Sequence, residues 1–478
     1  MTDAPGLITD GFLAAARAQP DKVALICGDQ TLSYGELAAH AARVAARIDQ
    51  LAARRVAIAR TNDAAVIELF LGVTMAGAVA MMFEPLWPRA VLDRMRAVHE
   101  PHLIFDDGTV ADYAAWRDAG DAARALLNRP TPDMPFLMGF TSGTTGTPKA
   151  FIRSHASWTA SFAASARELG TSSHTTALIP GPLSHGLSLY AAIETLYVGG
   201  TAVLMPAFDA VRAVQLIGAH VANTVVAAPT VLDLIADAGS SATATKIITA
   251  GAKLTAPLRQ KLAAVFSQAD VIEYYGASEL SFVTVAKPGD KCPPTSVGRA
   301  FANVAVAVRR DDGTQADVGE VGTVWVKSNM LSSGYVGPVD GTGFRTQGGW
   351  ATVGDRGSLD ARGFLTLAGR EGDMIITGGL NVYPSEVEAV LASLPGVREA
   401  AVVGQSDERW GQVVTAIVAG DGALTAEALK SQCREHLAPY KVPRRWYRAE
   451  SFDHTVSGKI DRAKLLAALD RAALKPLP

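Results

Sequence analysis

The segment from Phe140 to Ala150 is rich in hydrogen-bond donors. It reads FTSGTTGTPKA, with two glycines, five hydroxyl-bearing residues and one lysine within ten positions. Glycine tolerates the left-handed backbone conformation in which successive N–H groups point inward, and such a nest binds anions. The composition therefore predicts a phosphate-binding loop. Its members would be Thr141, Ser142, Gly143, Thr144, Thr145, Gly146 and Lys149.

This loop is not a Walker A motif, which requires Gly-Lys followed directly by Ser or Thr. Here Thr147 and Pro148 separate Gly146 from Lys149, so the P-loop NTPases are a poor fit. A Ser/Thr/Gly linker is the simpler alternative. The Pro-Lys pair and the apolar run at 136–138 directly before the loop are not linker composition.

A second candidate functional segment, YYGASE at 274–279, follows an apolar run at 271–272. An aromatic ring can stack on adenine, and Ser278 can donate to a phosphate. Glu279 offers the hard oxygen that Mg²⁺ takes alongside phosphate oxygens. Taken alone, a strand followed by a turn with a solvated glutamate explains the segment at least as well.

Three further charged residues stand in or beside glycine-containing segments. Asp355 ends TVGD, Arg370 follows Gly369, and Lys459 ends SGK. By itself, Lys459 would be an ordinary exposed lysine in a turn. It stands about ninety residues beyond Arg370, directly behind Ser457 and Gly458.

The elements expected to position these side chains alternate between strands and helices. From residue 55 to 275, short aliphatic runs alternate with helical patterns such as 211–219, 231–238 and 257–266, which predicts parallel sheets flanked by helices. Ligands in such folds lie at the carboxyl ends of the strands. The runs are 56–58, 103–105, 136–138, 177–179, 202–204, 225–227, 247–248 and 271–272.

The pattern changes after about residue 295. Runs at 304–308 and 322–326 flank a turn at Asp311-Asp312-Gly313 and indicate an antiparallel, strand-rich subdomain. The rest reads as a small α+β domain, with helices starting at Pro384 and Thr425 and strands at 400–403 and 413–418. We therefore predict an α/β protein with a large N-terminal domain at 1–369 and a small mobile domain at 370–478, joined by a hinge near 370–373.

Composition excludes several classes of partner. The 478 residues carry a net charge of −3, so no basic surface for nucleic acid or anionic lipid is expected. The three cysteines are scattered, without metal spacing, which fits a reducing compartment. The longest apolar run, 69–83, is shorter than the ~20 residues of a spanning helix, and the N-terminus lacks a signal-peptide pattern. We expect a soluble cytoplasmic monomer or homodimer without an integral membrane segment.

In their order and spacing, the motifs TSGTTGTPK, YYGASE, TVGD, GREGDMIITGGLNVYPSEVE and TVSGK resemble the ANL superfamily of adenylate-forming enzymes. That family comprises acyl- and aryl-CoA synthetases, NRPS adenylation domains and beetle luciferases. TLSYGEL at 31–37 and MAGAV at 75–79 extend the resemblance to nearly the whole chain. It implies that a carboxylate attacks the α-phosphate of Mg-ATP to give acyl-AMP, and that a thiol then displaces AMP.

The resemblance also implies a role for each matching residue. Thr141 to Lys149 would hold the β- and γ-phosphates, Ser278 and Glu279 would contact the α-phosphate and Mg²⁺, and Asp355 and Arg370 would bind the ribose. Tyr275 and the Ala250-Gly251-Ala252 turn would sandwich adenine, with Gly276 and Ala277 beside it. Lys459 would neutralise the two anions that must meet. The implied catalytic residues are Lys459, Glu279, Ser278 and Thr141.

The segment PLSHGL at 182–187 resembles the family's acyl-pocket motif. His185 would be a gate or wall of the pocket, although a histidine beside apolar residues is also a common packing residue. Gly276 replaces the tryptophan that closes the pocket of acetate-specific enzymes, so an apolar fatty or aryl acid larger than acetate is expected. The implied pocket residues are His185, Leu187, Ala228, Gly251 and Gly276.

The thiol acceptor is inferred from ITGGLNVYP at 376–384. Gly378, Gly379 and Leu380 resemble the wall of the pantetheine tunnel of CoA ligases, with a simple β-turn as the alternative. CoA is therefore the expected co-substrate. A carrier-protein phosphopantetheine and a catalytically silent binding protein stay open as alternatives. Gly372 replaces the Asp or Lys usual at the family's hinge and would rotate freely.

Overall fold

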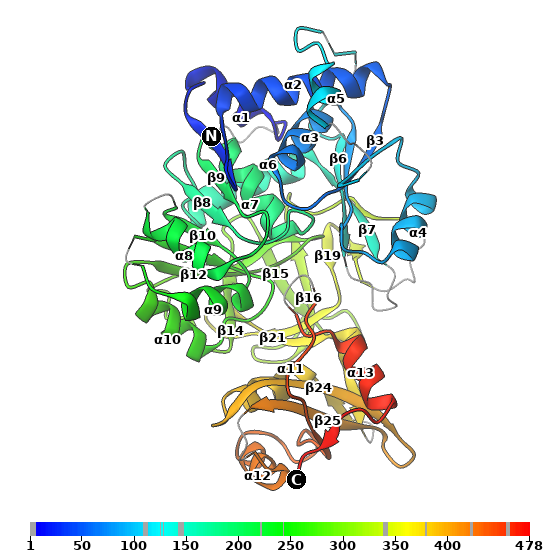
Figure 1. The fold of residues 1–478 in the computed structure, drawn as a ribbon. Helices are drawn as coiled ribbons and strands as arrows, with labels where there is room; N and C mark the ends of the chain where they lie inside the picture. The colour runs from blue at the N-terminus through cyan, green and yellow to red at the C-terminus, as the bar shows by residue number, and fades with distance from the viewer. Residues whose placement is uncertain are drawn as a thin grey trace. The chain divides into compact units, whose positions relative to one another are not determined.

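The computed structural model describes residues 6–108, 113–124, 126–127, 129–141, 148–219, 222–241, 243–337, 343–377, 380–420, 424–455 and 459–478. The chain divides into two compact units (Figure 1). The first unit comprises residues 1–306 and 325–353, and the second comprises 307–324 and 354–478. The predicted domain boundary near residue 370 lies within the second unit and stays a prediction.

The larger sheet contributes six neighbouring parallel strands to the first unit, in the order β12-β11-β10-β8-β9-β1. Antiparallel strands extend both ends: β2 pairs with β1, and β13 and β14 follow β12. The strand bounds are β1 Val23–Cys27, β2 Gln30–Ser33, β8 Thr176–Ile179, β9 Thr201–Leu204, β10 Thr224–Val226, β11 Lys246–Thr249, β12 Asp270–Ala277, β13 Ser281–Ala286 and β14 Ser296–Ala300.

Helices cover both faces of these parallel strands. Val225 and Ile247 point into a core formed with α8 (Ala210–Gly218), α9 (Pro229–Ala238) and α10 (Ala256–Val265). Their neighbours Val226 and Ile248 face α7 (Gly186–Tyr197) on the opposite side, as the two-residue period of a strand requires. Asp209 caps α8 by accepting a hydrogen bond from the Arg212 N–H, as its sequence position predicts.

A second sheet of the first unit has the order β17-β7-β6-β4-β3-β5. Its strands are β3 Arg55–Ala59, β4 Val79–Met82, β5 Leu103–Asp106, β6 Pro135–Thr141, β7 Lys149–Ser154 and β17 Gly334–Val336. The helices of this part are α1 Asp10–Ala18, α2 Tyr34–Gln50, α3 Ala64–Met75, α4 Arg89–His99, α5 Tyr113–Asp118 and α6 His155–Glu168.

The apolar run at 69–83 divides between helix α3 and strand β4. Its first half ends the almost entirely buried helix α3, Gly77 turns the chain with φ +66°, and β4 follows. No helix in the described ranges is long and apolar enough to cross a membrane.

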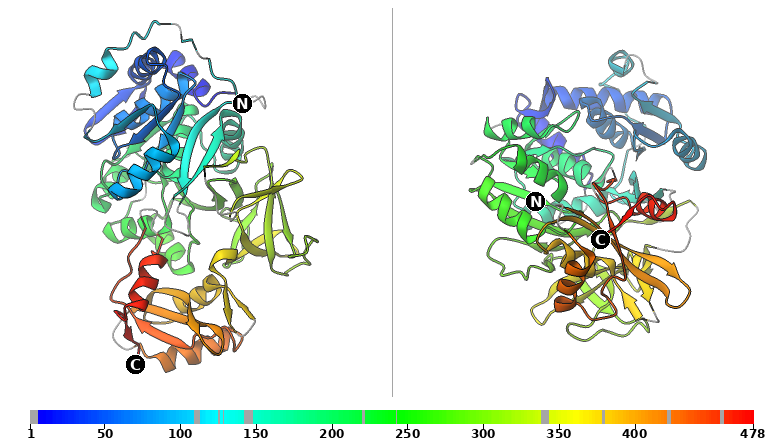
Figure 2. Two further views of the ribbon diagram at one scale, coloured as in Figure 1. Left: turned by 90° about the vertical axis from the view of Figure 1, so that its right-hand side faces the viewer. Right: turned by 60° about the horizontal axis from the view of Figure 1, so that its bottom comes forward.

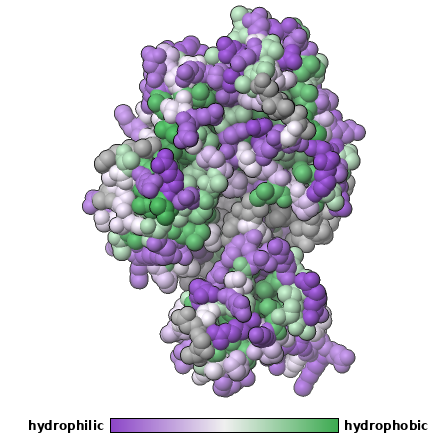
Figure 3. All heavy atoms as spheres, viewed as in Figure 1, coloured by the Kyte–Doolittle hydropathy of each residue, from purple (hydrophilic) through white to green (hydrophobic). Residues whose placement is uncertain are grey.

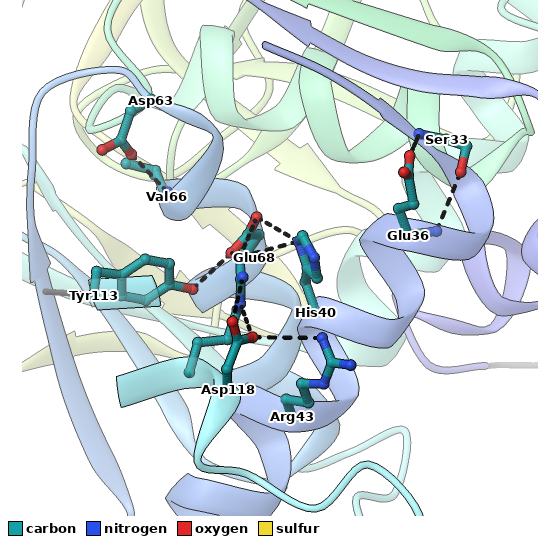
Figure 4. Close-up of polar contacts among 10 residues, drawn as sticks. Ser33, Glu36, His40, Arg43, Asp63, Val66, Glu68, Tyr113 and Asp118 are labelled. Carbon is teal, nitrogen blue, oxygen red and sulfur yellow. Dashed lines mark hydrogen bonds and ion pairs between the residues drawn. The ribbon is translucent and has the colours of Figure 1, made fainter. Parts of the chain in front are cut away.

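A buried carboxylate in α3 links three helices (Figure 4). Glu68 is 3 % exposed and accepts hydrogen bonds from Tyr113 at 3.0 Å and Arg117 at 3.0 Å, both in α5. The His40 Nδ1 in α2 lies 2.9 Å from the same carboxylate. Burial raises the pKa of Glu68, but the hydrogen bonds and charges of His40 and Arg117 outweigh it, so the pKa is lowered. The cluster therefore fixes α5 on α2 and α3.

The second unit ends in a mixed sheet of order β23-β22-β25-β26-β27, with β24 on β25. Figure 2 shows this part of the chain in gold to red. Val402 and Ala416 face α11 and α12, whereas Ala401 and Ile417 face α13. The helices begin as expected at Pro384 and after the Thr425 cap. The bounds are β22 Ile375–Thr377, β23 Leu380–Val382, α11 Pro384–Ala392, β24 Val397–Asp407, β25 Gly411–Gly420, α12 Ala426–His436, β26 Arg445–Arg448, α13 Arg462–Asp470 and β27 Lys475–Pro476.

The strands predicted after residue 295 are also present. A short 3₁₀ helix at Glu371–Asp373 follows β21. The remaining strands are β15 Ala305–Arg309, β16 Gly322–Lys327, β18 Arg345–Gln347, β19 Trp350–Thr352, β20 Asp355–Leu359 and β21 Phe364–Arg370, and the pairs β16–β19, β18–β19, β16–β20 and β20–β21 are antiparallel.

The face of the molecule drawn in Figure 3 is mixed in character. Figure 3 shows hydrophobic residues scattered among hydrophilic ones over this face. The exposed apolar side chains include Phe208, Val211 and Leu234, at the start of α8 and in α9.

Candidate active site

The predicted phosphate loop connects the two strands of a β-hairpin. Thr141, the last residue of β6, pairs with Lys149, the first residue of β7. Phe140 packs edge-on against Phe83 and Trp87, with ring centroids 5.2 and 5.3 Å apart, so the base of the hairpin is anchored in the core. The loop residues Ser142, Gly143, Thr144, Thr145 and Gly146 lie outside the described residues.

Glu279, the predicted Mg²⁺ ligand, lies in a polar environment built by a distant segment. Its side chain is 5 % exposed, and its Oε1 accepts a hydrogen bond from the Tyr335 hydroxyl at 2.7 Å. Its backbone oxygen accepts from Ser332 N at 2.8 Å. Glu279 is therefore held in place and is not the freely solvated glutamate of a surface turn.

Tyr335 also connects Glu279 to the phosphate-loop hairpin. It lies in β17, which pairs with β7, and the Lys149 Nζ lies 5.9 Å from the centroid of its ring. A lysine over an aromatic face is attracted by the negative face of the ring. One side chain thus contacts both a predicted phosphate-binding residue and the predicted metal ligand.

Arg153 adds a buried positive charge to the same region. It is 2 % exposed in β7, and its Nη1 donates to the Met330 carbonyl at 2.6 Å. Burial lowers the pKa of Arg153 to about 10, and electrostatic interactions with Tyr190 and Glu279 oppose this shift. The Arg153 guanidinium therefore contributes positive potential at Glu279.

Replacing Tyr335 by phenylalanine is expected to reduce kcat/KM for ATP about tenfold or more. The change keeps the ring beneath Lys149 but removes a hydrogen bond to a charged group, which contributes about 1.5–3 kcal/mol. Pyrophosphate release at varied ATP concentration measures it. Tyr113→Phe is the matched control, because it removes the hydroxyl that donates to Glu68 at 3.0 Å and should lower stability without raising KM for ATP. An unchanged KM and kcat in Tyr335→Phe would show that the contact has no part in the reaction.

His185, the predicted gate, is the N-cap residue of α7 and is paired with a residue that sequence reasoning missed. Its Nε2 lies 3.0 Å from the Glu84 Oε2, which also accepts from the Ser184 hydroxyl at 2.6 Å. Burial raises the pKa of Glu84, but hydrogen bonds from His185, Ser184 and the Leu86 N–H outweigh it and lower the pKa. Glu84 is therefore a carboxylate at neutral pH and fixes the orientation of His185.

The start of α7 meets the YYGASE segment. A β-carbon on Gly186 would lie 3.4 Å from the Ser278 Oγ, which places this hydroxyl beside the helix N-terminus. Backbone N–H groups and the helix dipole make such an end favourable for anions. Ser278 and α7 can therefore receive a carboxylate or phosphate together.

Three other predicted pocket residues, Ala228, Gly251 and Gly276, lie at the carboxyl ends of neighbouring parallel strands. Ala228 follows β10 as the N-cap of α9, Gly251 follows β11, and Tyr275 to Ala277 belong to β12. Gly251 has φ +91°, with no heavy atom within 4 Å of a β-carbon built on it, so the turn through Ala250, Gly251 and Ala252 is open on that side.

Gly276 has a structural reason that the sequence did not reveal. A β-carbon there would lie 2.3 Å from the Ser281 carbonyl oxygen in β13, where the β12–β13 register shifts. A side chain at this position therefore requires the hairpin to move. The glycine is needed by the strand pair itself, in addition to any effect on pocket size.

In the second unit, the two predicted ribose-binding residues contact each other. Asp355 and Arg370 are partners in the β20–β21 register, and the Arg370 Nε donates to the Asp355 Oδ1 at 2.7 Å. Asp355 is buried and follows Gly354, which has φ +81°. Gly372 lies in the 3₁₀ helix, and no heavy atom lies within 4 Å of a β-carbon built on it.

Lys459 and the predicted CoA segment also belong to the second unit. The Lys459 N–H donates to the Thr455 Oγ1 at 3.3 Å, and its carbonyl accepts from Thr455 N at 2.7 Å. Lys459 is exposed. Leu380 is 48 % exposed and pairs with Thr377 in the β22–β23 hairpin. Gly378 and Gly379 lie outside the described residues.

Two sequence models of one family match this chain. The AMP-binding enzyme model matches residues 12–336, and the AMP-binding enzyme C-terminal domain model matches residues 386–459. The chain belongs to the AMP-binding enzyme family.

Relatives of this AMP-binding enzyme match over nearly their full length. It is 36 % identical over 481 residues to the uncharacterized acyl-CoA ligase YhfT of Bacillus subtilis, covering 97 % of this chain and 99 % of the relative. It is 31 % identical over 473 residues to the long-chain-fatty-acid–CoA ligase FadD13 of Mycobacterium tuberculosis, covering 90 % and 92 %. The o-succinylbenzoate CoA synthetase MenE of Bacillus subtilis, solved with its acyl-adenylate intermediate, superposes with a TM-score of 0.83 at 26 % identity, covering 95 % and 97 %.

These likenesses confirm three predictions for the AMP-binding enzyme. The chain is an adenylate-forming enzyme, it is a ligase, and its fold is α/β with a large N-terminal part and a smaller C-terminal part. The roles of individual residues stay predictions. Sequence reasoning missed Tyr335, Glu84 and Arg153, because each reaches the site through pairing with a segment far away in the chain.

Proposed function

We propose that this protein activates a carboxylic acid larger than acetate with ATP and transfers it to CoA. The acid carboxylate attacks the α-phosphate of ATP, which releases pyrophosphate and gives acyl-AMP. The CoA thiol then attacks the acyl carbon, which releases AMP and gives the thioester. The observation that carries this proposal is the position of Ser278 beside the start of α7 and next to the buried Glu279. The two family models match residues 12–336 and 386–459 of the same chain.

The residues of the first unit suit the adenylation step. Lys149 and Thr141 border the loop that would hold the β- and γ-phosphates, and Ser278 beside α7 would receive the α-phosphate or the acid carboxylate. Tyr275 and the turn at Gly251 would enclose adenine at the carboxyl ends of β11 and β12. Charge that develops on the phosphorus is best stabilised by donors already in place.

Residues of the second unit would complete the nucleotide site. Asp355, oriented by Arg370, would accept hydrogen bonds from the ribose hydroxyls. Lys459 would neutralise the carboxylate and the α-phosphate as they approach. Gly372 would permit rotation of the segment that carries Lys459. This segment would then turn away from the nucleotide site before the thiol enters.

Glu279 fits a Mg²⁺ ion that is bound mainly by phosphate oxygens. Mg²⁺ uses one or two protein carboxylates together with substrate oxygens and water. With Oε1 held by Tyr335, the Glu279 carboxylate is a fixed hard ligand. Such an ion would neutralise the charge of the leaving pyrophosphate.

The acceptor and the place of action complete the proposal. We propose CoA as the acceptor, with its pantetheine arm passing Gly378, Gly379 and the exposed Leu380. We place the activity in the cytoplasm, where ATP and CoA are available and where the free cysteines Cys27, Cys292 and Cys433 stay reduced.

A panel of fatty and aryl acids tests this function. AMP release and thioester formation are measured with ATP, Mg²⁺ and CoA, with acetate as the small-acid control. We expect CoA-dependent thioester formation with at least one larger acid and none with acetate. Thioester formation that requires a carrier protein instead of CoA would show that the acceptor is the phosphopantetheine of that carrier protein. ATP binding without acid-dependent pyrophosphate exchange would identify a silent binding protein.

A further inference from the structure

A small cavity lies between α7 and the parallel strands of the first unit. It has a volume of about 20 Å³, which is room for roughly one water molecule. Its strand side is formed by Val226, Ile248 and Tyr274, which follow one face of β10, β11 and β12. Its helix side begins at Leu187, a predicted pocket residue.

The helix side of the cavity follows a single face of α7. Leu187, Tyr190, Ala191, Glu194 and Thr195 all line it, with the spacing of three, four and seven residues that brings side chains together on a helix. Seven residues correspond to about 10 Å of helix. The lining residues therefore extend along about two turns of α7, from Leu187 near its start to Glu194.

The Glu194 carboxyl group is incompletely bonded. The residue is 4 % exposed, its Oε2 accepts a hydrogen bond from the Thr171 hydroxyl at a long 3.5 Å, and its Oε1 has no partner among the described residues. Buried polar atoms in folded proteins are nearly always paired, by protein or by ordered water. The structure thus offers one hydrogen-bonding position at the far end of the cavity.

We propose, on the basis of the proposed function, that this position binds a hydroxyl group at the distal end of the acid substrate. The preferred substrates are hydroxy acids, aliphatic or aromatic, whose hydroxyl takes the place of one water molecule beside the Glu194 Oε1. Val226 and Ile248, which line the same cavity, would contact the apolar atoms next to this hydroxyl.

The charge of the cavity favours a hydroxyl over an amine or a methyl group. Burial raises the pKa of Glu194 to about 8, although Ser165, Thr171 and Lys246 oppose this, so the group is a neutral acid at pH 7. A neutral acid can both donate and accept, as a hydroxyl can. An ammonium group would need an ionised partner in an apolar surrounding, and a methyl group would leave a buried polar atom unpaired.

Matched acid pairs test this assignment with the intact enzyme, ATP and CoA. Each pair has one length and shape, with a hydroxyl in one member and a methyl group in the other: ω-hydroxy fatty acids against fatty acids, and hydroxy-substituted against methyl-substituted benzoates and cinnamates. We expect kcat/KM to favour the hydroxy member of at least one pair about 10- to 100-fold. The two series separate an aliphatic from an aromatic substrate.

Variants connect the preference to Glu194. Glu194→Gln keeps a donor and an acceptor and should retain the preference, whereas Glu194→Met should abolish or reverse it. Tyr197→Phe is the control, because it removes a hydroxyl from α7 outside the cavity lining and should change nothing. Equal kcat/KM values for both members of every pair, or a preference that persists in Glu194→Met, would overturn the assignment. If no acid gives a thioester, the proposed function itself fails instead.

Discussion

Replacing Lys459 by alanine is expected to slow acyl-AMP formation by a factor of about 10² to 10³ and to leave the second step largely intact. A preorganised charge at the reacting phosphate contributes this much by analogy with a single oxyanion donor. The second step needs no cation between two anions, and the segment that carries Lys459 is proposed to have rotated away by then.

The two half-reactions are measured separately. Acid-dependent exchange of labelled pyrophosphate into ATP reports the first, and thioester formation from supplied acyl-AMP and CoA reports the second. Lys464→Ala is the matched control, since Lys464 is an exposed lysine in α13 whose only short ionic contact in the described residues is to Asp453 at 3.7 Å. Equal losses in both half-reactions for Lys459→Ala would contradict the proposed division of labour.

Glu194→Gln is expected to become more stable relative to the natural protein as the pH rises from 5 to 8. The folded protein holds the Glu194 proton up to about pH 8, while the ordinary value for the unfolded chain is 4.5. Within this window the unfolded state binds fewer protons, so unfolding becomes easier with rising pH. The difference in unfolding free energy should grow by up to roughly 4 kcal/mol, and glutamine, which does not ionise, should lack it.

Chemical denaturation of both proteins at several pH values measures this effect. The other titratable groups near Glu194 are Tyr190 in α7, Tyr274 in β12 and Lys246 in β11; burial raises the pKa of both tyrosines and lowers that of Lys246. Glu194→Met should show the same change with pH as Glu194→Gln, because both remove the titrating group. Parallel pH profiles of the natural protein and both variants would show that Glu194 does not carry the proton.

Local patterns predicted most of the fold. Asp209, Pro384 and Thr425 mark helix starts through short-range chemistry, and the aliphatic runs between 56 and 272 all lie in or at strands. The run at 69–83 was harder to interpret, since its apolar composition hides the turn at Gly77 between α3 and β4. Periodicity cannot locate such a change when both elements are fully buried.

The candidate site was only partly predictable. Motif residues such as Ser278 and Glu279 stand in recognisable segments, but their partners do not. Tyr335 contacts Glu279 across 56 positions, and Glu84 contacts His185 across 101. Glu194 had one detectable signal, as a single carboxyl group seven residues after Leu187 in an otherwise uncharged helical stretch. An isolated charge on an apolar helix face marks a position worth examining.

The close contact at Gly276 restricts how the selectivity of this enzyme can be altered. Bulk introduced there would meet the Ser281 carbonyl before it could fill the pocket, so shortening the accepted acid by enlarging this residue would disturb the β12–β13 strand pair first. The inner face of α7 presents no such backbone obstacle at Leu187, Ala191 or Glu194, which are side chains on a regular helix. Redesign for a new substrate, by selection or in the laboratory, should therefore succeed through changes along this helix.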